Sequence, residues 1–225
     1  MMYLSRLTLN PRNPGARRDA ARPYGLHQTL RRSLDHLPDS ERGPLLFRLE
    51  PERGPGGPVV LVQSAMEPQW DGLLANGYLL RADGPKPFTP SLTDGQRLRF
   101  RLLANPVKRV RVEGKKHAVR VPLTHPAFTA AQRDADPSLK GYLDWLNRQA
   151  RSHGFQVVSV QDAPLPAARA RPASEPVRKA DIPHFGVRFD GLLQVADPHK
   201  LTAALRAGIG PAKAFGFGLL SVAPA

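Results

Sequence analysis

The chain has 225 residues, no cysteine and a formal net charge of +14, with 33 lysines and arginines against 19 aspartates and glutamates. The lack of cysteine excludes a disulfide scaffold, a zinc–thiolate site and a thiol nucleophile. No apolar run is long enough to span a membrane and the first residues lack the apolar core of a signal peptide, so we expect a cytoplasmic protein of one large or two small domains.

The first 84 residues predict a strand, a helix, two strands, a helix and a strand, which is the βαββαβ order of a ferredoxin-like domain. Residues 4–9 alternate apolar and polar side chains, as a strand does, and a proline-rich loop with an arginine pair follows. Pro23 opens a helix whose leucines recur at helical spacing to Leu34. The remaining predicted elements are strands at 44–50 and 58–64 around a Gly- and Pro-rich hairpin, a short helix at 68–75 and a strand at 78–81.

The same order repeats after a segment rich in proline and glycine at 83–95. We therefore predict an α+β protein of two tandem ferredoxin-like (RRM-related) domains, at 1–84 and 96–225, joined by a linker at 85–95. In the second domain we expect a strand at 96–103, a basic ribbon at 108–121, a helix at 139–151, a strand at 155–160, a mobile loop at 162–180, a strand at 185–195, a helix opened by Asp197 and Pro198 and running to Arg206, and a strand at 219–223.

The positive charge is concentrated in two segments. Residues 1–36 hold seven arginines against two aspartates, a net of +5, and residues 97–120 hold nine basic side chains against Glu113, a net of +8. Such focused charge suits a groove for a polyanion, most often a nucleic acid, provided that the two segments are neighbours in space. Two alternatives are the general basicity of a GC-rich genome and a solvated strand face, which the alternating arginines of residues 97–101 also fit.

The seven histidines form neither an H-x-H nor an H-E-x-x-H motif, and the acidic residues offer no two-metal cluster. We therefore expect no metal and no other cofactor, which disfavours a metal-dependent nuclease.

Residues 208–218 hold four glycines in eleven positions, between a predicted helix and the last strand. Glycines let a backbone approach a phosphate closely and turn N–H groups toward it. The segment is neither a dinucleotide fingerprint nor a P-loop, and an ordinary glycine-rich turn is the alternative interpretation.

Tyr24 and His27 are three residues apart on the first predicted helix and therefore share a face, with Arg31 and Arg32 four and five residues beyond His27. Metal-free RNA cleavage uses the ribose 2′-OH as nucleophile, a histidine for proton transfer and a cation for the charge on phosphorus. A single histidine on an amphipathic helix is, however, more often a packed or solvated residue.

Several segments, taken together and in order, resemble one known family. They are LSRLTLNP from Leu4, RRD from Arg17, PYGLHQTL from Pro23, LFRLE from Leu46, VVLVQS from Val59, KPF from Lys86, RLRFRLLANPVKR from Arg97, FDGLL from Phe189 and GIGPAKAFGFGLLSVAP from Gly208. With these segments the chain resembles the CRISPR repeat-processing endoribonucleases of type I-E systems, the CasE family of Cascade complexes. Residues 112–180 carry the least of the resemblance.

The resemblance implies tandem ferredoxin-like domains and a metal-independent endoribonuclease that cuts repeat RNA at the base of its hairpin. The implied products are a 2′,3′-cyclic phosphate and a 5′-OH, and the implied partners are the retained RNA hairpin and other Cascade subunits, with no membrane and no small-molecule cofactor. The family's catalytic histidine and tyrosine match His27 and Tyr24, and a basic residue further along the helix matches Arg32. RNA contacts are implied for Arg31, Lys108, Arg109, Lys115, Lys116, Arg169, Arg171, Gly208, Gly210, Lys213, Gly216 and Gly218.

Two other functions stay open at the level of the sequence. One is a non-catalytic double-ferredoxin protein that binds an RNA hairpin and uses His27 only as a contact. The other is a basic DNA-binding or ribosome-associated protein.

Overall fold

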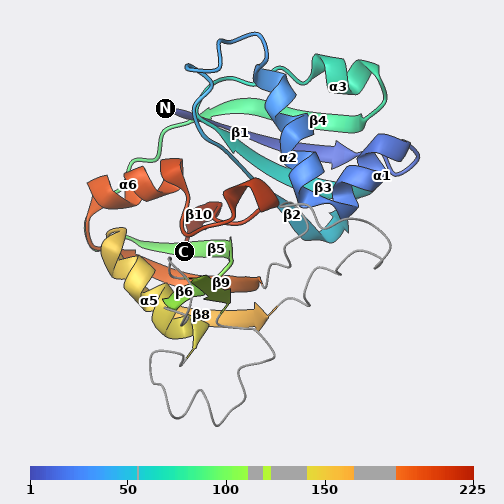
Figure 1. The fold of residues 1–225 in the computed structure, drawn as a ribbon. Coiled ribbons are helices and arrows are strands. Elements are labelled where there is room, and N and C mark those ends of the chain that lie inside the picture. Colours follow the sequence, from blue (N-terminus) through green and yellow to red (C-terminus); the bar gives the residue numbers. More distant parts are fainter. Residues whose placement is uncertain (55, 111–118, 123–140, 165–185) are drawn as a thin grey trace. The chain divides into compact units, whose positions relative to one another are not determined.

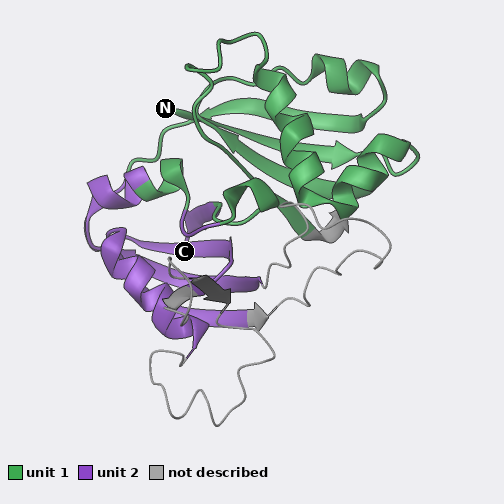
Figure 2. Cartoon of the chain, in the orientation of Figure 1, with its two compact units in different colours: residues 1–91, 204–208, 212–219 green, residues 92–203, 209–211, 220–225 purple. Residues whose placement is uncertain are grey.

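A computed structural model describes residues 1–54, 56–110, 119–122, 141–164 and 186–225 (Figure 1). It contains two four-stranded antiparallel sheets with helices and a two-stranded ribbon. The chain divides into two compact units (Figure 2). The first unit comprises residues 1–91, 204–208 and 212–219, and the second comprises residues 92–203, 209–211 and 220–225. The domain boundaries near 84 and 96 stay a prediction.

The first unit has the expected βαββαβ order, with one helix more than expected, and its sheet has the strand order β2-β3-β1-β4. Alternation along β1 places Leu7 and Leu9 in the core together with Leu26 and Leu30 of the second helix. The elements are β1 (Met2–Leu9), α1 (Pro14–Ala21), α2 (Pro23–Arg31), the 3-10 turn η1 (Arg32–Leu34), β2 (Leu45–Gly54), β3 (Gly57–Ser64), α3 (Asp71–Ala75) and β4 (Leu79–Phe88).

Three expectations for the first unit were wrong in detail. The loop expected after β1 contains α1, because Asn13 caps this helix by accepting a hydrogen bond from the Ala16 amide at 3.1 Å and Pro14 fits its first turn. The strand expected at 78–81 continues to Phe88, because β4 is an edge strand and an edge tolerates proline. The hairpin between β2 and β3 is shorter than expected, because both strands extend into it.

The second unit repeats the order and its sheet has the strand order β10-β5-β9-β8, which corresponds to that of the first sheet. Asp197 caps the second helix as expected, since its Oδ1 accepts a hydrogen bond from the Lys200 amide at 3.0 Å. The elements are β5 (Arg97–Ala104), β6 (Val107–Val110), β7 (Val119–Pro122), α5 (Tyr142–Ser152), β8 (Phe155–Pro164), β9 (Val187–Val195), α6 (Pro198–Ala207), the 3-10 turn η4 (Lys213–Phe215) and β10 (Leu220–Pro224).

The predicted basic ribbon contains the antiparallel pair β6 and β7. The loop expected at 162–180 was wrong at its start, because residues 162–164 pair with β9 as the end of β8. The rest of that predicted loop lies outside the described residues.

Within the described part of the chain, no helix combines the length and apolar character needed to cross a membrane.

Candidate active site

The site is built on α2, which begins at Pro23, a residue suited to the first helical turn because that turn needs no amide donor there. Tyr24 and His27 share a face of this helix, with 6.4 Å between their ring centroids. The Tyr24 side chain is exposed and His27 is half-buried. The spacing in the sequence had predicted this pair.

The imidazole of His27 lies on the ring of Phe47 from β2. The two ring centroids are 6.0 Å apart and the planes differ by 22°. Nδ1 of His27 is buried and has no hydrogen-bond partner among the described residues. Burial lowers the pKa of His27 below its ordinary 6.5, and the neighbouring Arg31 charge lowers this pKa further. His27 is therefore mainly neutral at pH 7.

The turn η4 packs against the same residues. The Phe215 ring lies 5.6 Å from that of Tyr24, centroid to centroid. Gly216 follows with a left-handed backbone at φ 83°, and a Cβ at this position would lie 3.2 Å from the Phe47 ring. Phe47 thus packs against both His27 and the glycine backbone. Sequence reasoning missed Phe47 and Phe215, since neither lies near α2 in the chain and both have the ordinary pattern of core residues.

The segment before β10 is also fixed to the other face of the first sheet. Arg48 is only 3% exposed, and its Nη1 donates a hydrogen bond to the Leu219 carbonyl at 3.1 Å. The same guanidinium pairs with Glu50 at 2.7 Å. Gln63 is buried and donates a hydrogen bond to the Leu205 carbonyl at 2.6 Å. Residues 205–219 therefore contact both faces of the edge strand β2. They contact Arg48 on one face and Phe47 on the other.

A buried carboxylate joins α1 to α2. Oδ2 of Asp19 accepts hydrogen bonds from the Thr29 hydroxyl at 2.8 Å and the Tyr78 hydroxyl at 3.0 Å. Burial, helped by the Asp19 charge, raises the pKa of Tyr78, so this phenol remains a donor. Gly25 leaves room for the carboxylate, since a Cβ there would lie 3.0 Å from Asp19 Oδ1. This network joins the helix that carries His27 to α1 and to Tyr78.

The two predicted arginines differ in their relation to His27. Arg31 follows His27 by one helical turn, is half-buried and contributes to the lowered pKa of His27. Arg32 is exposed and is the first residue of η1. Its position is about 140° around the helix from His27 at 3.6 residues per turn. The role expected for Arg32 stays a prediction.

The predicted RNA contacts are placed unevenly. Lys213 begins η4 beside α2. Three of the four glycines meet core side chains, since a Cβ would lie 2.9 Å from Leu46 at Gly208, 2.9 Å from Trp145 at Gly210 and 3.2 Å from Phe47 at Gly216. Close packing thus accounts for these glycines without a ligand, and their RNA contacts, like that of Gly218, stay predictions.

The backbones of Lys108 and Arg109 lie in β6, whereas Lys115, Lys116, Arg169 and Arg171 lie outside the described residues. Residues 1–36 belong to the first unit and the described part of residues 97–120 to the second. One groove for both basic segments therefore stays a prediction. Among the described residues, no three His, Asp or Glu side chains gather closely enough to hold a metal ion.

Comparison with known proteins shows the family. A family profile described as CRISPR associated protein matches residues 2–224. The chain is 41% identical to CRISPR-associated endoribonuclease Cse3 of Thermus thermophilus over 230 residues, covering 99% of this chain and 100% of that protein. It is 31% identical to CRISPR system Cascade subunit CasE of Escherichia coli K12, with the same coverage.

A solved structure of Thermus thermophilus Cse3, bound to an RNA representing a pre-cleavage complex, matches the fold with a TM-score of 0.76. It is 42% identical and the match covers 99% of each chain. The predicted α+β class with two ferredoxin-like sheets is confirmed. The chain therefore belongs to the family of CRISPR-associated proteins that includes Cse3 and CasE.

Proposed function

We propose that this chain is an endoribonuclease that cuts CRISPR precursor RNA at the base of its repeat hairpin and retains the product as a Cascade subunit. The observation that carries the proposal is His27, a neutral imidazole packed on Phe47 beside the exposed Tyr24. The names of Cse3, an endoribonuclease, and CasE, a Cascade subunit, support it.

The reaction is an internal transfer at phosphorus that needs no metal ion. The 2′-oxygen forms a bond to the adjacent phosphorus while its proton passes to Nε2 of His27, since Nδ1 is the buried nitrogen. The bond from phosphorus to the 5′-oxygen breaks, this oxygen takes a proton from water to become the 5′-OH, and the protonated His27 returns its proton to the solvent. The other product is a 2′,3′-cyclic phosphate. A neutral histidine suits the first proton transfer because it accepts a proton at physiological pH.

The neighbouring residues have supporting roles. Tyr24 shares the exposed face of α2 with His27 and orients the nucleotide or assists proton transfer. Arg32 balances the charge that develops on the phosphate, and Arg31 contributes to binding on the same helix. The RNA hairpin is held through its backbone and shape by the basic ribbon, the arginines of 169–171 and the segment from Gly208 to Gly218. The protein works in the cytoplasm, where its RNA substrate is made.

The test is cleavage of a repeat hairpin, taken from the genome's own CRISPR array, in EDTA. His27→Ala should abolish cleavage and leave hairpin binding unchanged. His199→Ala is the matched control, because His199 is exposed on α6 and belongs to the second unit. A 2′-deoxy nucleotide before the cut should stop cleavage by the wild-type protein but not binding.

Three results contradict the proposal. Cleavage by His27→Ala at the wild-type rate removes His27 from the mechanism, and cleavage of the 2′-deoxy RNA excludes internal attack. A wild-type protein that binds the hairpin without cutting it is the non-catalytic RNA-binding protein instead.

A further inference from the structure

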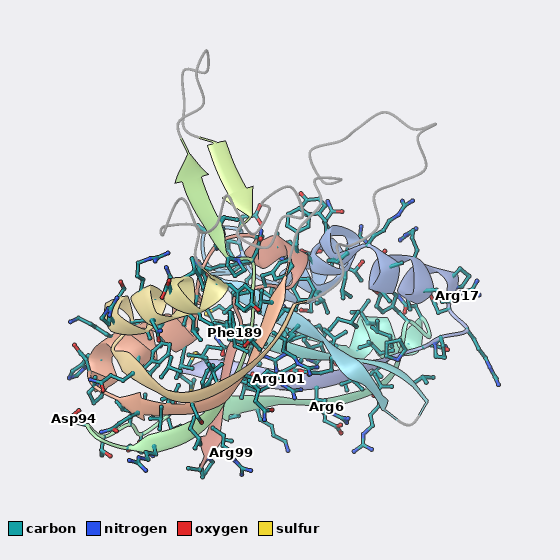
Figure 3. The ribbon with its side chains drawn as sticks, turned by 90° about the horizontal axis from the view of Figure 1, so that it is seen from below. Arg6, Arg17, Asp94, Arg99, Arg101 and Phe189 are labelled. Carbon is teal, nitrogen blue, oxygen red and sulfur yellow. The ribbon has the colours of Figure 1, made fainter. Side chains whose placement is uncertain are left out.

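The face of the second sheet opposite α5 carries a row of arginines. On the α5 side, the Phe189 ring of β9 stacks on Trp145 of α5, with 6.5 Å between centroids. Along β5 the residues alternate between buried and exposed, with Leu98 and Phe100 buried and Arg97 and Arg99 exposed. Figure 3 shows Phe189 on the side of α5 and Arg99 on the opposite side. The arginine row therefore projects away from the core of the unit.

The strand register identifies what surrounds these arginines. Arg97 lies opposite Gln194, Arg99 opposite Leu192 and Arg101 opposite Asp190. Residues that are direct cross-strand partners lie on the same face of a sheet. The same pairing continues into neighbouring strands, so that the face also includes Gln156, Ser159 and Gln161 of β8, Ser221 and Ala223 of β10, and Leu103 and Arg188 of β5 and β9.

This face has an excess of positive charge. Arg101 pairs with Asp190 at 2.6 Å, and Arg188 Nε lies 3.0 Å from the same carboxylate. Asp190 thus compensates one of the charges that Arg101 and Arg188 bring. Arg99 donates a hydrogen bond to the Pro224 carbonyl at 2.9 Å. Within the part of the chain that the structure describes, neither Arg97 nor Arg99 has a carboxylate partner.

We propose that this arginine face binds single-stranded RNA next to the hairpin, through phosphates rather than bases. Alternate residues of a strand are about 7 Å apart, so the arginines form one straight row that suits the phosphates of a single extended strand. RRM sheets bind bases by stacking them on aromatic side chains. None of the register partners named above is aromatic, whereas several are glutamines or serines, whose side chains donate hydrogen bonds. We therefore expect binding without sequence preference.

The identity of the RNA rests on the proposed function, but binding by this face does not. The test compares three RNAs on the full chain: the repeat hairpin with a 2′-deoxy nucleotide at the cut, the same hairpin with a single-stranded uridine flank, and the uridine strand alone. Arg97→Gln with Arg99→Gln removes two charges from the face. The matched control is Arg148→Gln with Arg151→Gln, which removes two exposed charges from α5 on the other side of the same sheet.

The wild-type protein and the α5 control should bind the flanked hairpin more tightly than the bare hairpin. The Arg97 and Arg99 variant should lose this advantage and bind the bare hairpin as before. Its plot of log affinity against log salt for the flanked RNA should be shallower by about 1.4, since each phosphate contact on a single strand contributes about 0.7.

The proposal is overturned if the flank adds no affinity in the wild-type protein, or if both double variants behave alike. Binding of the uridine strand alone tests the arginine face without any contribution from the hairpin. A protein that binds the uridine strand through Arg97 and Arg99 but does not cut the hairpin contradicts the proposed function alone. A protein that cuts the hairpin and ignores the uridine strand contradicts this inference alone.

Discussion

Arg48 in the first compact unit and Arg99 in the second both project from a strand on the face opposite the helix of their own unit, α2 or α5. Arg48 is 3% exposed and gives its hydrogen bonds to Glu50 and the Leu219 carbonyl. Arg99 is exposed on a row of arginines. Two sheets of the same strand order thus use this face in different ways, one to fix a distant segment of chain and the other to present charge.

The difference shows what decides whether a polar residue on such a face is buried or exposed. In the first unit, Arg48 and Gln63 can be buried because the main-chain carbonyls of Leu219 and Leu205, respectively, accept their hydrogen bonds. In the second unit, the register partners of Arg97 and Arg99 are a glutamine and a leucine, which leave the charges to solvent or to a ligand.

Arg48→Met should have the largest effect on stability. It leaves Glu50 without its buried cation and the Leu219 carbonyl without this donor, and breaking such a buried pair typically costs about 3–5 kcal/mol. Urea unfolding measures the loss. The control is Arg81→Met, because Arg81 pairs with Asp83 over a short distance but is 70% exposed. An equal loss for both variants would show that the buried hydrogen bonds of Arg48 stabilise the fold no more than an exposed ion pair does.

A second prediction concerns Gly216, where the chain passes over Phe47. Gly216→Ala places a methyl group at positive φ and 3.2 Å from the ring on which His27 lies. Positive φ alone costs an L-residue about 1–2 kcal/mol. The matched control is Gly95→Ala, at φ 74° with its nearest atom 4.0 Å away, which measures this backbone cost alone.

We expect Gly216→Ala to lose more stability than Gly95→Ala in urea unfolding, and to cut a repeat hairpin more slowly at equal folded fraction. The displaced Phe47 ring disturbs His27 in the first variant only. Equal stability and equal cleavage in the two variants would show that Phe47 does not depend on this glycine.

The regular part of the fold was predictable because it depends on local periodicity. Alternation located β1 and β5, and an aspartate before a proline located the start of α6. Proline misled in both directions, since Pro14 starts α1 and Pro85 lies in the edge strand β4, where its missing amide hydrogen is tolerated.

The site was predictable only for residues that lie close together in the sequence. The spacing of Tyr24 and His27 on one helix was enough to place them together. Phe47 and Phe215 come from a strand and a distant turn, and no periodicity relates them to α2. Likewise, glycines that fit tightly against Leu46 and Phe47 have the same sequence pattern as glycines that bind a phosphate.

A smaller effect is expected at Ala212, the residue before η4. Ala212 has φ 65° and ψ 31°, a left-handed conformation that disfavours an L-residue. Ala212→Gly should therefore raise the free energy of unfolding, by about 1 kcal/mol or less, because the relief of strain exceeds the added chain entropy. Ala223→Gly in β10 is the control with the opposite sign, since glycine weakens a strand. Loss of stability in both variants would show that Ala212 is not strained.

The smallest expected effect separates burial from charge at His27. Both lower the pKa of this histidine, with burial the larger cause and the Arg31 charge the smaller. Arg31→Gln removes the charge and leaves the ring on Phe47, so the pKa of His27 should rise but stay below 6.5. The neutral imidazole is the proton acceptor, so cleavage should fall as pH decreases through this pKa, and in Arg31→Gln the fall should begin at a higher pH. NMR titration of the imidazole measures the shift directly.

Arg32→Gln is the matched control, because Arg32 lies about 140° around the helix from His27 and should leave the pKa of His27 unchanged. A return to 6.5 in Arg31→Gln would show that the Arg31 charge, and not burial, lowers the pKa of His27. A larger rise in Arg32→Gln than in Arg31→Gln would place Arg32 beside the imidazole instead.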